Sequence, residues 1–258
     1  MLNNLNINFG VLLTMIFKPV VLDLSHHNTI QSFADMKAAG IVGIIHKCTE
    51  GTSYVDAKYA SRKAMALKAG FLWGAYHFAT NADVNDQVEH FLDTADADEN
   101  TLLALDFEPN PSGGTMDLDQ AREWLKLVAS KTGQRPILYS GNLIKETLGN
   151  DDDEFFGSHR LWLAQYGKIA RVPSAWNNWW LWQYAADGVG PEPHEVDGID
   201  GTPDVNIYNG KVSDLIANWV DIPGSNIKAK KAPAGMKKKV KAKKVPAAKK
   251  KKAKTKKK

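Results

Sequence analysis

Two carboxylates separated by one residue, Asp106 and Glu108, are the side chains best placed to do chemistry. They end an apolar run that has the length of a buried strand and stops before Pro109. Side chains two positions apart on a strand point to the same face. Two like charges at close range raise the pKa of one member, so one carboxyl can keep a proton near neutral pH beside an anion. Glycosidic bond cleavage requires that division between a proton donor and an anion that faces the developing oxocarbenium ion.

Two further acidic residues border apolar runs. Asp23 lies near the end of the run 19–24, and Asp204 stands at the start of the run 205–207. A carboxylate in an apolar strand is unfavourable unless it is paired or hydrated. A single such residue is most simply explained as a cap or a loop ligand. Four of them, with two on one strand face, favour a shared catalytic site.

Aromatic and amide side chains end several other apolar runs. Such side chains stack on sugar rings and bind sugar hydroxyls, which suits a carbohydrate cleft. At least half of them are expected to pack in the core instead. The residues concerned are Tyr76, His77, Phe78, Tyr139, Trp162, Gln165, Tyr166, Trp182, Gln183 and Tyr184.

Apolar runs of strand length alternate with stretches of helical periodicity from Pro19 onward. Parallel strands joined by right-handed crossovers produce this alternation. Eight strands within about 200 residues favour a closed (β/α) barrel, with its active site at the carboxyl ends of the strands, over an open doubly wound sheet. Clear helices are lacking late in the chain, which predicts an incomplete outer ring. The expected strands are 19–24, 42–48, 71–78, 101–108, 136–139, 161–165, 179–184 and 205–207, and the expected helices are 30–39, 56–69, 84–95, 118–132 and 143–148.

Charge divides the chain into two parts. Residues 228–258 hold 17 Lys and no acidic residue, which leaves 16 basic and 29 acidic residues, a net charge of −13, for the rest. Low-complexity sequence of this kind cannot bury enough apolar surface to offset chain entropy. We therefore expect an N-terminal extension or weak signal at 1–18, a barrel domain at 19–221 and a disordered Lys-rich tail at 222–258. Arguments from positive charge to anionic partners apply to the tail alone.

The N-terminal apolar run, 9–17, is too short to span a membrane. It also lacks the basic n-region and clear cleavage site of an ordinary signal peptide, so a weak export signal and a simple extension both remain open. No other segment is expected to be transmembrane. The single cysteine, Cys48, excludes an intramolecular disulfide and is expected to be a small buried strand residue.

The chain resembles glycoside hydrolase family 25, the Chalaropsis-type lysozymes, which include many phage endolysins. Seven short segments carry the resemblance, in the order in which the family has them, and they fall within residues 19–220. No single segment is decisive, but the ordered set is specific. The segments are Val21–Ser25, Lys47–Gly51, Gly74–Phe78, Leu105–Glu108, Leu161–Tyr166, Trp182–Tyr184 and Asp204–Asn206.

The resemblance implies a flattened, incomplete (β/α) barrel with five βα units and three further strands. It implies hydrolysis of the β-1,4 bond from N-acetylmuramic acid to N-acetylglucosamine in bacterial peptidoglycan, without a cofactor or metal. At the matching positions, Glu108 would be the general acid, and Asp106 would stabilise the transition state, for example by orienting the acetamido group of the substrate. Asp23 and Asp204 would complete the acidic cluster. Four side chains would lie along the substrate groove, namely Glu50, Tyr76, Tyr139 and Trp182.

Two other functions remain open from the residues alone. A metal-dependent hydrolase could use the four carboxylates with His26, His27 or His77, although no HxH or HxxxH pair stands out. The two adjacent histidines are more simply structural. A barrel that binds glycan without cutting it is the second alternative, but such a relative would be expected to lose the acid at position 108.

We expect the enzyme to be a monomer that acts outside the cell or at the cell wall, and a phage endolysin fits equally well. For the basic tail, anionic envelope polymers are favoured over nucleic acid as the partner. Electrostatic tethering to such polymers would raise the local concentration of the enzyme at the wall.

Overall fold

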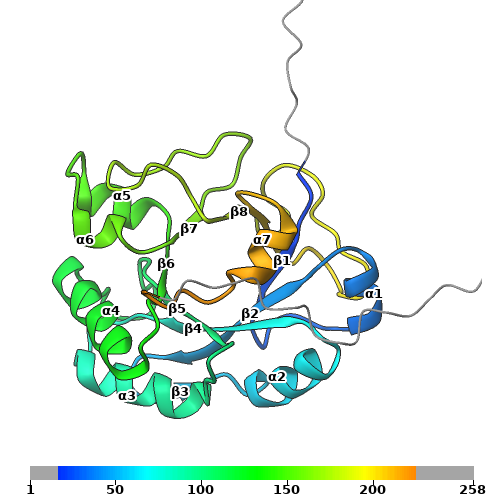
Figure 1. Cartoon of the computed structure of the whole chain (residues 1–258), viewed down its shortest axis with the longest axis horizontal. Coiled ribbons are helices and arrows are strands. Elements are labelled where there is room, and N and C mark those ends of the chain that lie inside the picture. The colour runs from blue at the N-terminus through cyan, green and yellow to red at the C-terminus, as the bar shows by residue number, and fades with distance from the viewer. Residues whose placement is uncertain (1–16, 225–258) are drawn as a thin grey trace, which may run out of the picture.

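The structure is a computed structural model that describes residues 17–224. A closed eight-stranded barrel forms its centre (Figure 1). The ring consists of β1 (Val21–Leu24), β2 (Gly43–Glu50), β4 (Leu72–Phe78), β5 (Leu102–Asp106), β6 (Ile137–Ser140), β7 (Leu161–Ala164), β8 (Leu181–Ala185) and β9 (Asp204–Tyr208). The ring closes because β1 pairs with both β2 and β9. A two-residue strand, β3 (Tyr54–Val55), pairs with the end of β2 and was not expected from the sequence.

Seven strands of the ring run parallel and the last runs against both of its neighbours. Strand β9 is antiparallel to β8 and to β1. Its register with β1 places Asp204 opposite Asp23. The beginning of β9 therefore meets the carboxyl end of β1 at one rim of the barrel, where the active site of a (β/α) barrel lies.

Helices follow the first five barrel strands. They are α1 (Phe33–Ala38), α2 (Tyr59–Lys68), α3 (Val84–Ala95), α4 (Leu118–Thr132) and α5 (Asn142–Leu148), with the short helices α6 (Glu154–Gly157) and α7 (Val212–Ala217) later in the chain. Long loops without helices connect β7, β8 and β9, so the outer ring is incomplete (Figure 1). The expected layout of five βα units and three further strands is confirmed.

Local signals define the two long helices at their ends. Asp117 caps α4, accepting a hydrogen bond from the Gln120 backbone N–H, while the Gln120 side chain binds the Asp117 N–H in return. Gly133 ends the same helix with φ of 72°, a conformation that favours glycine. Asp83 caps α3 in a similar way. The bounds of both helices agree with those expected from the sequence.

Strand alternation separates two apolar layers. Outward side chains such as Leu22 and Leu105 pack against the helices, where Trp124 is fully buried. Inward side chains such as Ile45 and Ala104 fill the barrel together with Trp219, which follows α7. The Trp219 indole N–H donates to the Trp73 carbonyl oxygen at 2.8 Å. A Cβ atom on Gly43 would lie only 2.9 Å from the Trp219 ring, so a larger residue there would displace Trp219.

The chain ends of the described region bear on the expected domain boundaries. Phe17 falls in the expected N-terminal extension, yet it is buried, with its ring 5.5 Å from Trp182 and 4.6 Å from Tyr184. Ile222 falls in the expected tail, yet it is partly buried against the inner layer. Residues 1–16 and 225–258, which include all of the tail lysines, lie outside the described residues. Within residues 17–224, no helix has the length and apolar character needed to cross a membrane. Cys48 is fully buried in β2, as expected.

Candidate active site

Four carboxylates meet at one rim of the barrel. Asp23 comes from the end of β1, Asp106 is the last residue of β5, Glu108 follows two residues later, and Asp204 begins β9. Asp23 and Asp106 are buried, whereas Glu108 and Asp204 are half-buried. Each of the four is linked electrostatically to at least one of the others. The structure therefore brings together all four acids that were singled out in the sequence.

Burial and mutual repulsion favour protonated carboxyls in this cluster. Burial, followed by the charge of Glu108, raises the pKa of Asp106 well above its usual range. Burial, followed by the charge of Asp23, also raises the pKa of Glu108. The Oδ1 atom of Asp106 is buried and has no hydrogen-bond partner among the described residues. The pair can thus hold a proton near neutral pH, and one buried carboxyl oxygen is left for an incoming group.

Asp23 lies in a different environment, surrounded by amide donors. Gln183 Nε2 donates to both of its carboxylate oxygens, at 3.0 and 3.1 Å, and Asn206 Nδ2 donates to Oδ2 at 2.7 Å. Burial raises the pKa of Asp23 to about 6, although these hydrogen bonds oppose the rise. Burial and the charge of Asp23 raise the pKa of Asp204 further, to about 9. The hydrogen bonds thus favour the ionised form of Asp23, and the charge of Asp23 favours the protonated form of Asp204.

The cation Lys47 opposes two of the four acids, Asp106 and Glu108. Lys47, on β2, forms an ion pair with Glu50 at 2.6 Å from Nζ to Oε2. Its Nζ also lies 4.8 Å from the centre of the Phe78 ring and 5.3 Å from that of Tyr54. The charge of Lys47 lowers the pKa of both Asp106 and Glu108. Glu50 was expected at the groove from the sequence, whereas Lys47, three residues earlier, had no expected role.

Aromatic side chains surround the cluster on the inner face. Tyr139 is buried and donates its hydroxyl hydrogen to Gln183 Oε1 at 2.9 Å. Its ring lies edge-on to Trp162, with 4.6 Å between centroids, and Tyr76 contacts the same indole at 6.4 Å. The carboxylates Asp106 and Glu108 raise the pKa of Tyr76 and Tyr139, after burial, which places both tyrosines beside the acids.

Trp182 does not line the groove, which corrects one expectation. Its side chain is fully buried in the outer layer, and its indole N–H donates to the Gln165 carbonyl oxygen at 2.6 Å. Strand alternation explains the error, because Leu181 points inward and its successor must point outward. Gln183, the next residue, faces inward and binds Asp23 and Asp204. Counting alternate positions from Leu181 would have selected it.

The histidines considered for a metal site have other partners. His77 points to the outer layer, where its ring bonds Thr49 and Gln87 and stacks on Trp124. Burial lowers its pKa to about 3. His26 Nδ1 lies 3.1 Å from Asp56 Oδ2. Across residues 17–224, no group of three His, Cys, Asp or Glu side chains is arranged to hold a metal ion.

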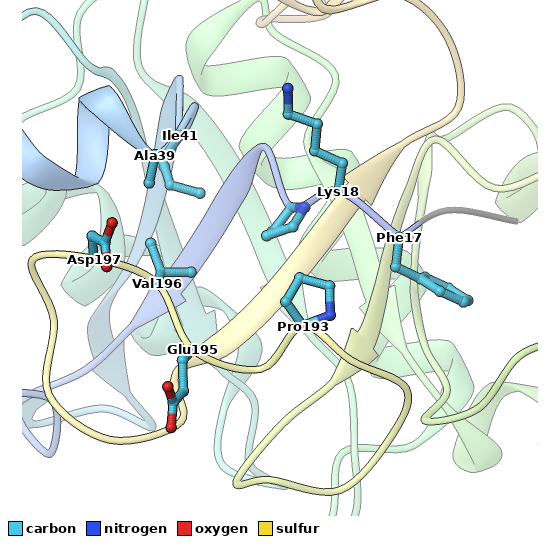
Figure 2. A pocket seen from close by; sticks show the side chains of 9 residues that line it. Phe17, Lys18, Ala39, Ile41, Pro193, Glu195, Val196 and Asp197 are labelled. Atoms are coloured by element: carbon cyan, nitrogen blue, oxygen red, sulfur yellow. The ribbon is translucent and has the colours of Figure 1, made fainter.

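Two surface cavities lie away from the acids. One, of about 310 Å³, lies between the segment that leads into β1 and the loop 193–197, and Phe17, Ile41 and Val196 are among its lining residues (Figure 2). The other, of about 330 Å³, is bordered by Arg160 and Trp180. None of the four carboxylates lines either cavity.

Comparisons with known proteins agree with this geometry. The model of the family "Glycosyl hydrolases family 25" matches residues 22–192. The chain is 30% identical over 210 residues to "Lysozyme M1" of Streptomyces globisporus, covering 76% of this chain and 69% of that protein. It is 27% identical over 179 residues to the "N,O-diacetylmuramidase" of Chalaropsis sp, covering 62% of this chain and 85% of that protein.

Among solved structures, the bacterial lysozyme from Streptomyces coelicolor superposes with a TM-score of 0.67. The two sequences are 28% identical, and the match covers 76% of this chain and 94% of that one. The family match includes Asp106, Glu108 and the first seven barrel strands from Leu22 onward. On these grounds the chain belongs to glycosyl hydrolase family 25 and is a glycosidase.

Proposed function

We propose that this chain is a lysozyme, an N-acetylmuramidase that hydrolyses the β-1,4 bond between N-acetylmuramic acid and N-acetylglucosamine in bacterial peptidoglycan. The observation that carries the proposal is the cluster of four carboxylates at the barrel rim, two of them following one strand. The names of the relatives, a lysozyme and a diacetylmuramidase, support this substrate class.

Glu108 is proposed as the general acid that protonates the leaving glycosidic oxygen. Its half-buried position supports this role, because a proton donor must be shielded enough to stay protonated and exposed enough to reach substrate. Burial and the charge of Asp23 raise its pKa in the required direction. Glycosidases that use two carboxyls place them in different environments, so that one stays protonated as the acid and the other stays ionised.

Asp106 is proposed to stabilise the positive charge that develops at the anomeric carbon. Burial and the charge of Glu108 raise the pKa of Asp106, but a protonated Glu108 and a positive charge on the sugar both favour the ionised form of Asp106. Asp106 is more deeply buried than Glu108, and its unpaired Oδ1 supports contact with a substrate group such as the acetamido N–H. Either a covalent intermediate or assistance by the acetamido oxygen is compatible with two close carboxyls. Asp23 and Asp204 complete the cluster, and Tyr76, Tyr139 and Glu50 are proposed to border the sugar.

The test is digestion of purified peptidoglycan, with the new reducing end identified by mass spectrometry. A muramic acid end is expected, and an N-acetylglucosamine end would show that the bond assignment is wrong. Glu108→Gln should lower activity by roughly 10²–10⁴-fold, the usual contribution of general acid catalysis, with an unchanged thermal unfolding curve. Glu89→Gln is the matched control, since that side chain is 66% exposed on α3. If Glu108→Gln stayed within tenfold of the control, about 1.4 kcal/mol, another residue would be the acid.

The basic tail is proposed to tether the enzyme to anionic envelope polymers, in line with action at the cell wall. Its 17 Lys residues in 228–258 support this through charge alone. A truncation after Gly224 suits the test, because it keeps Asp221, whose carbonyl oxygen accepts from the Arg135 N–H at 2.7 Å. Hydrolysis of small soluble substrates should persist, while binding to whole walls should weaken and become less sensitive to salt. Unchanged wall binding, or tighter binding to nucleic acid than to wall polymers, would reject the tether.

A further inference from the structure

A buried hydrogen-bond chain runs beneath the acidic cluster. It begins at Trp162 on β7, whose indole N–H donates to Asn206 Oδ1 at 2.6 Å. Asn206 Nδ2 in turn donates to Asp23 Oδ2 at 2.7 Å and to the Val21 carbonyl oxygen at 3.3 Å. Trp162 is 2% exposed and Asn206 is fully buried. Water therefore cannot reach these groups and cannot replace the hydrogen bonds between them.

The indole N–H of Trp162 determines the donor-to-acceptor direction of these hydrogen bonds. An indole N–H can only donate, so the amide oxygen of Asn206 must face Trp162. The amide nitrogen is then forced to face Asp23, and the carbonyl of Val21, which can only accept, holds the amide in the same orientation. Asp23 Oδ2 is left as an acceptor. A proton on that oxygen would point at an N–H group and lose the hydrogen bond.

A second branch reaches Asp23 from the other side. Tyr139 donates to Gln183 Oε1 at 2.9 Å, which turns Gln183 Nε2 toward the two carboxyls. That nitrogen lies 3.0 and 3.1 Å from the oxygens of Asp23 and 3.4 Å from Asp204 Oδ2. Both branches therefore offer donors to Asp23, and the closer contacts go to Asp23 rather than to Asp204.

We propose that Trp162 and Tyr139 are positioning residues that act through Asn206 and Gln183 to hold Asp23 as an anion. The proton of the Asp23–Asp204 pair then resides on Asp204, and Asp23 presents a fixed negative charge to the site. The consequence for catalysis rests on the proposed function, because the charge of Asp23 matters there by keeping the proton on Glu108. The anionic state of Asp23 follows from the hydrogen bonds alone.

Asp204 also favours the ionised form of Asp23, because its side-chain hydrogen bond with Asp23 lowers the pKa of Asp23, whereas the other ionisable groups around Asp23 do not. Asp106 and Glu108 face it from β5 and the residues after it, and both are acids that would favour a protonated Asp23. Three tyrosines also border it, namely Tyr76, Tyr139 and Tyr166. The cation Lys47 acts on Asp106 and Glu108. The amide donors lower the pKa of Asp23, together with the hydrogen bond from Asp204, while the charge of Asp187 adds to the rise in the pKa of Asp204. These contributions distinguish Asp23 from Asp204, in agreement with pKa values of about 6 and about 9.

The direct test measures the titration of Asp23 by ¹³C NMR of aspartate carboxyl carbons, with the Asp23 signal identified by its loss in Asp23→Asn. Trp162→Phe keeps a ring in place and removes the N–H that binds Asn206 Oδ1, so the amide is held only by its contacts with Val21 and Asp23 and its hydrogen bond to Asp23 is weakened. The pKa of Asp23 should rise by roughly one unit, as expected when a charge-assisted hydrogen bond is lost. Trp124→Phe is the matched control, because its buried N–H has no hydrogen-bond partner within residues 17–224. It should leave the titration unchanged.

Tyr139→Phe provides an independent variant, since it loosens the second branch and should move the pKa of Asp23 in the same direction. If neither variant shifts the Asp23 signal relative to Trp124→Phe, the inference is wrong. The pH profile of kcat/KM adds the catalytic arm. An upward shift of the acidic limb is expected, whereas a merely structural role would lower activity at every pH without moving the limb. If the NMR titration of Asp23 shifted while the pH profile of kcat/KM did not, the hydrogen-bond control of Asp23 would stand and the proposed catalytic mechanism would be rejected.

Discussion

Replacement of Asp204 by Asn should remove a pH-dependent loss of stability. Burial, followed by the charge of Asp23, raises the pKa of Asp204 from 3.8 to about 9. Between these values the unfolded chain has released this proton while the folded chain keeps it. The unfolded state then binds fewer protons, so the free energy of unfolding falls as pH rises, by about 1.4 kcal/mol per pH unit for one proton. The introduced amide does not titrate, and its N–H can donate to Asp23 as the protonated carboxyl does.

Guanidinium denaturation at about pH 6 and about pH 8 measures this effect, and over that interval Asp204→Asn should gain about 3 kcal/mol relative to the wild type. The comparison between variant and wild type is needed because buried histidines act in the opposite direction. Burial lowers the pKa of His46 to about 4 and that of His77 to about 3, so their contribution to stability is lost as pH falls below 6.5. Asp93→Asn, on the exposed side of α3, is the surface control. A stability difference that stays constant with pH would refute a protonated Asp204.

Three further predictions concern Lys47, Trp219 and the end of α4 at Gly133. Lys47→Met should raise the pKa of Asp106 and Glu108, since Lys47 lowers both, and the basic limb of the kcat/KM profile should move to higher pH, whereas Lys47→Arg should retain the wild-type limb. Trp219→Ala should cost roughly 3–5 kcal/mol in guanidinium denaturation, because it empties the apolar end of the barrel. Gly133→Ala should cost about 1 kcal/mol in thermal unfolding through φ of 72° alone, because a Cβ there would meet nothing within 4 Å.

The parts of the fold that could be predicted are those encoded by neighbouring residues. The bounds of α3 and α4 follow from a capping carboxylate immediately before each amphipathic stretch, and Gly133 supplies the end of α4. The barrel strands follow from short apolar runs between such helices. In contrast, β3 is two exposed residues that pair with Thr49 and Glu50, where β2 extends past β1. No periodicity can mark an element of that length.

The role of the carboxylates could be predicted, whereas the hydrogen bonds of the amides to Asp23 could not, for a physical reason. A charged residue in an apolar strand is conspicuous because its burial is costly without a partner. Asn206 and Gln183 carry no charge, and their partners lie far away in sequence, since Asn206 and Trp162 are 44 positions apart. The error at Trp182 has a related origin, since a residue type suggested sugar stacking while the strand face decided the position. Strand faces become known only with the register of the ring.

The reversed direction of β9 explains why these groups meet at all. In a barrel with every strand parallel, the first residue of the last strand would lie at the rim opposite the carboxyl ends, the end that Trp219 fills with apolar atoms. Because β9 runs antiparallel, Asp204 pairs with Asp23 at the catalytic rim, and Asn206, two residues later, lies one layer deeper beside Val21. That depth lets Asn206 reach upward to Asp23 and sideways to Trp162. A single reversal of strand direction thus supplies the fourth acid and, on the same inward face, the amide that holds the first acid ionised.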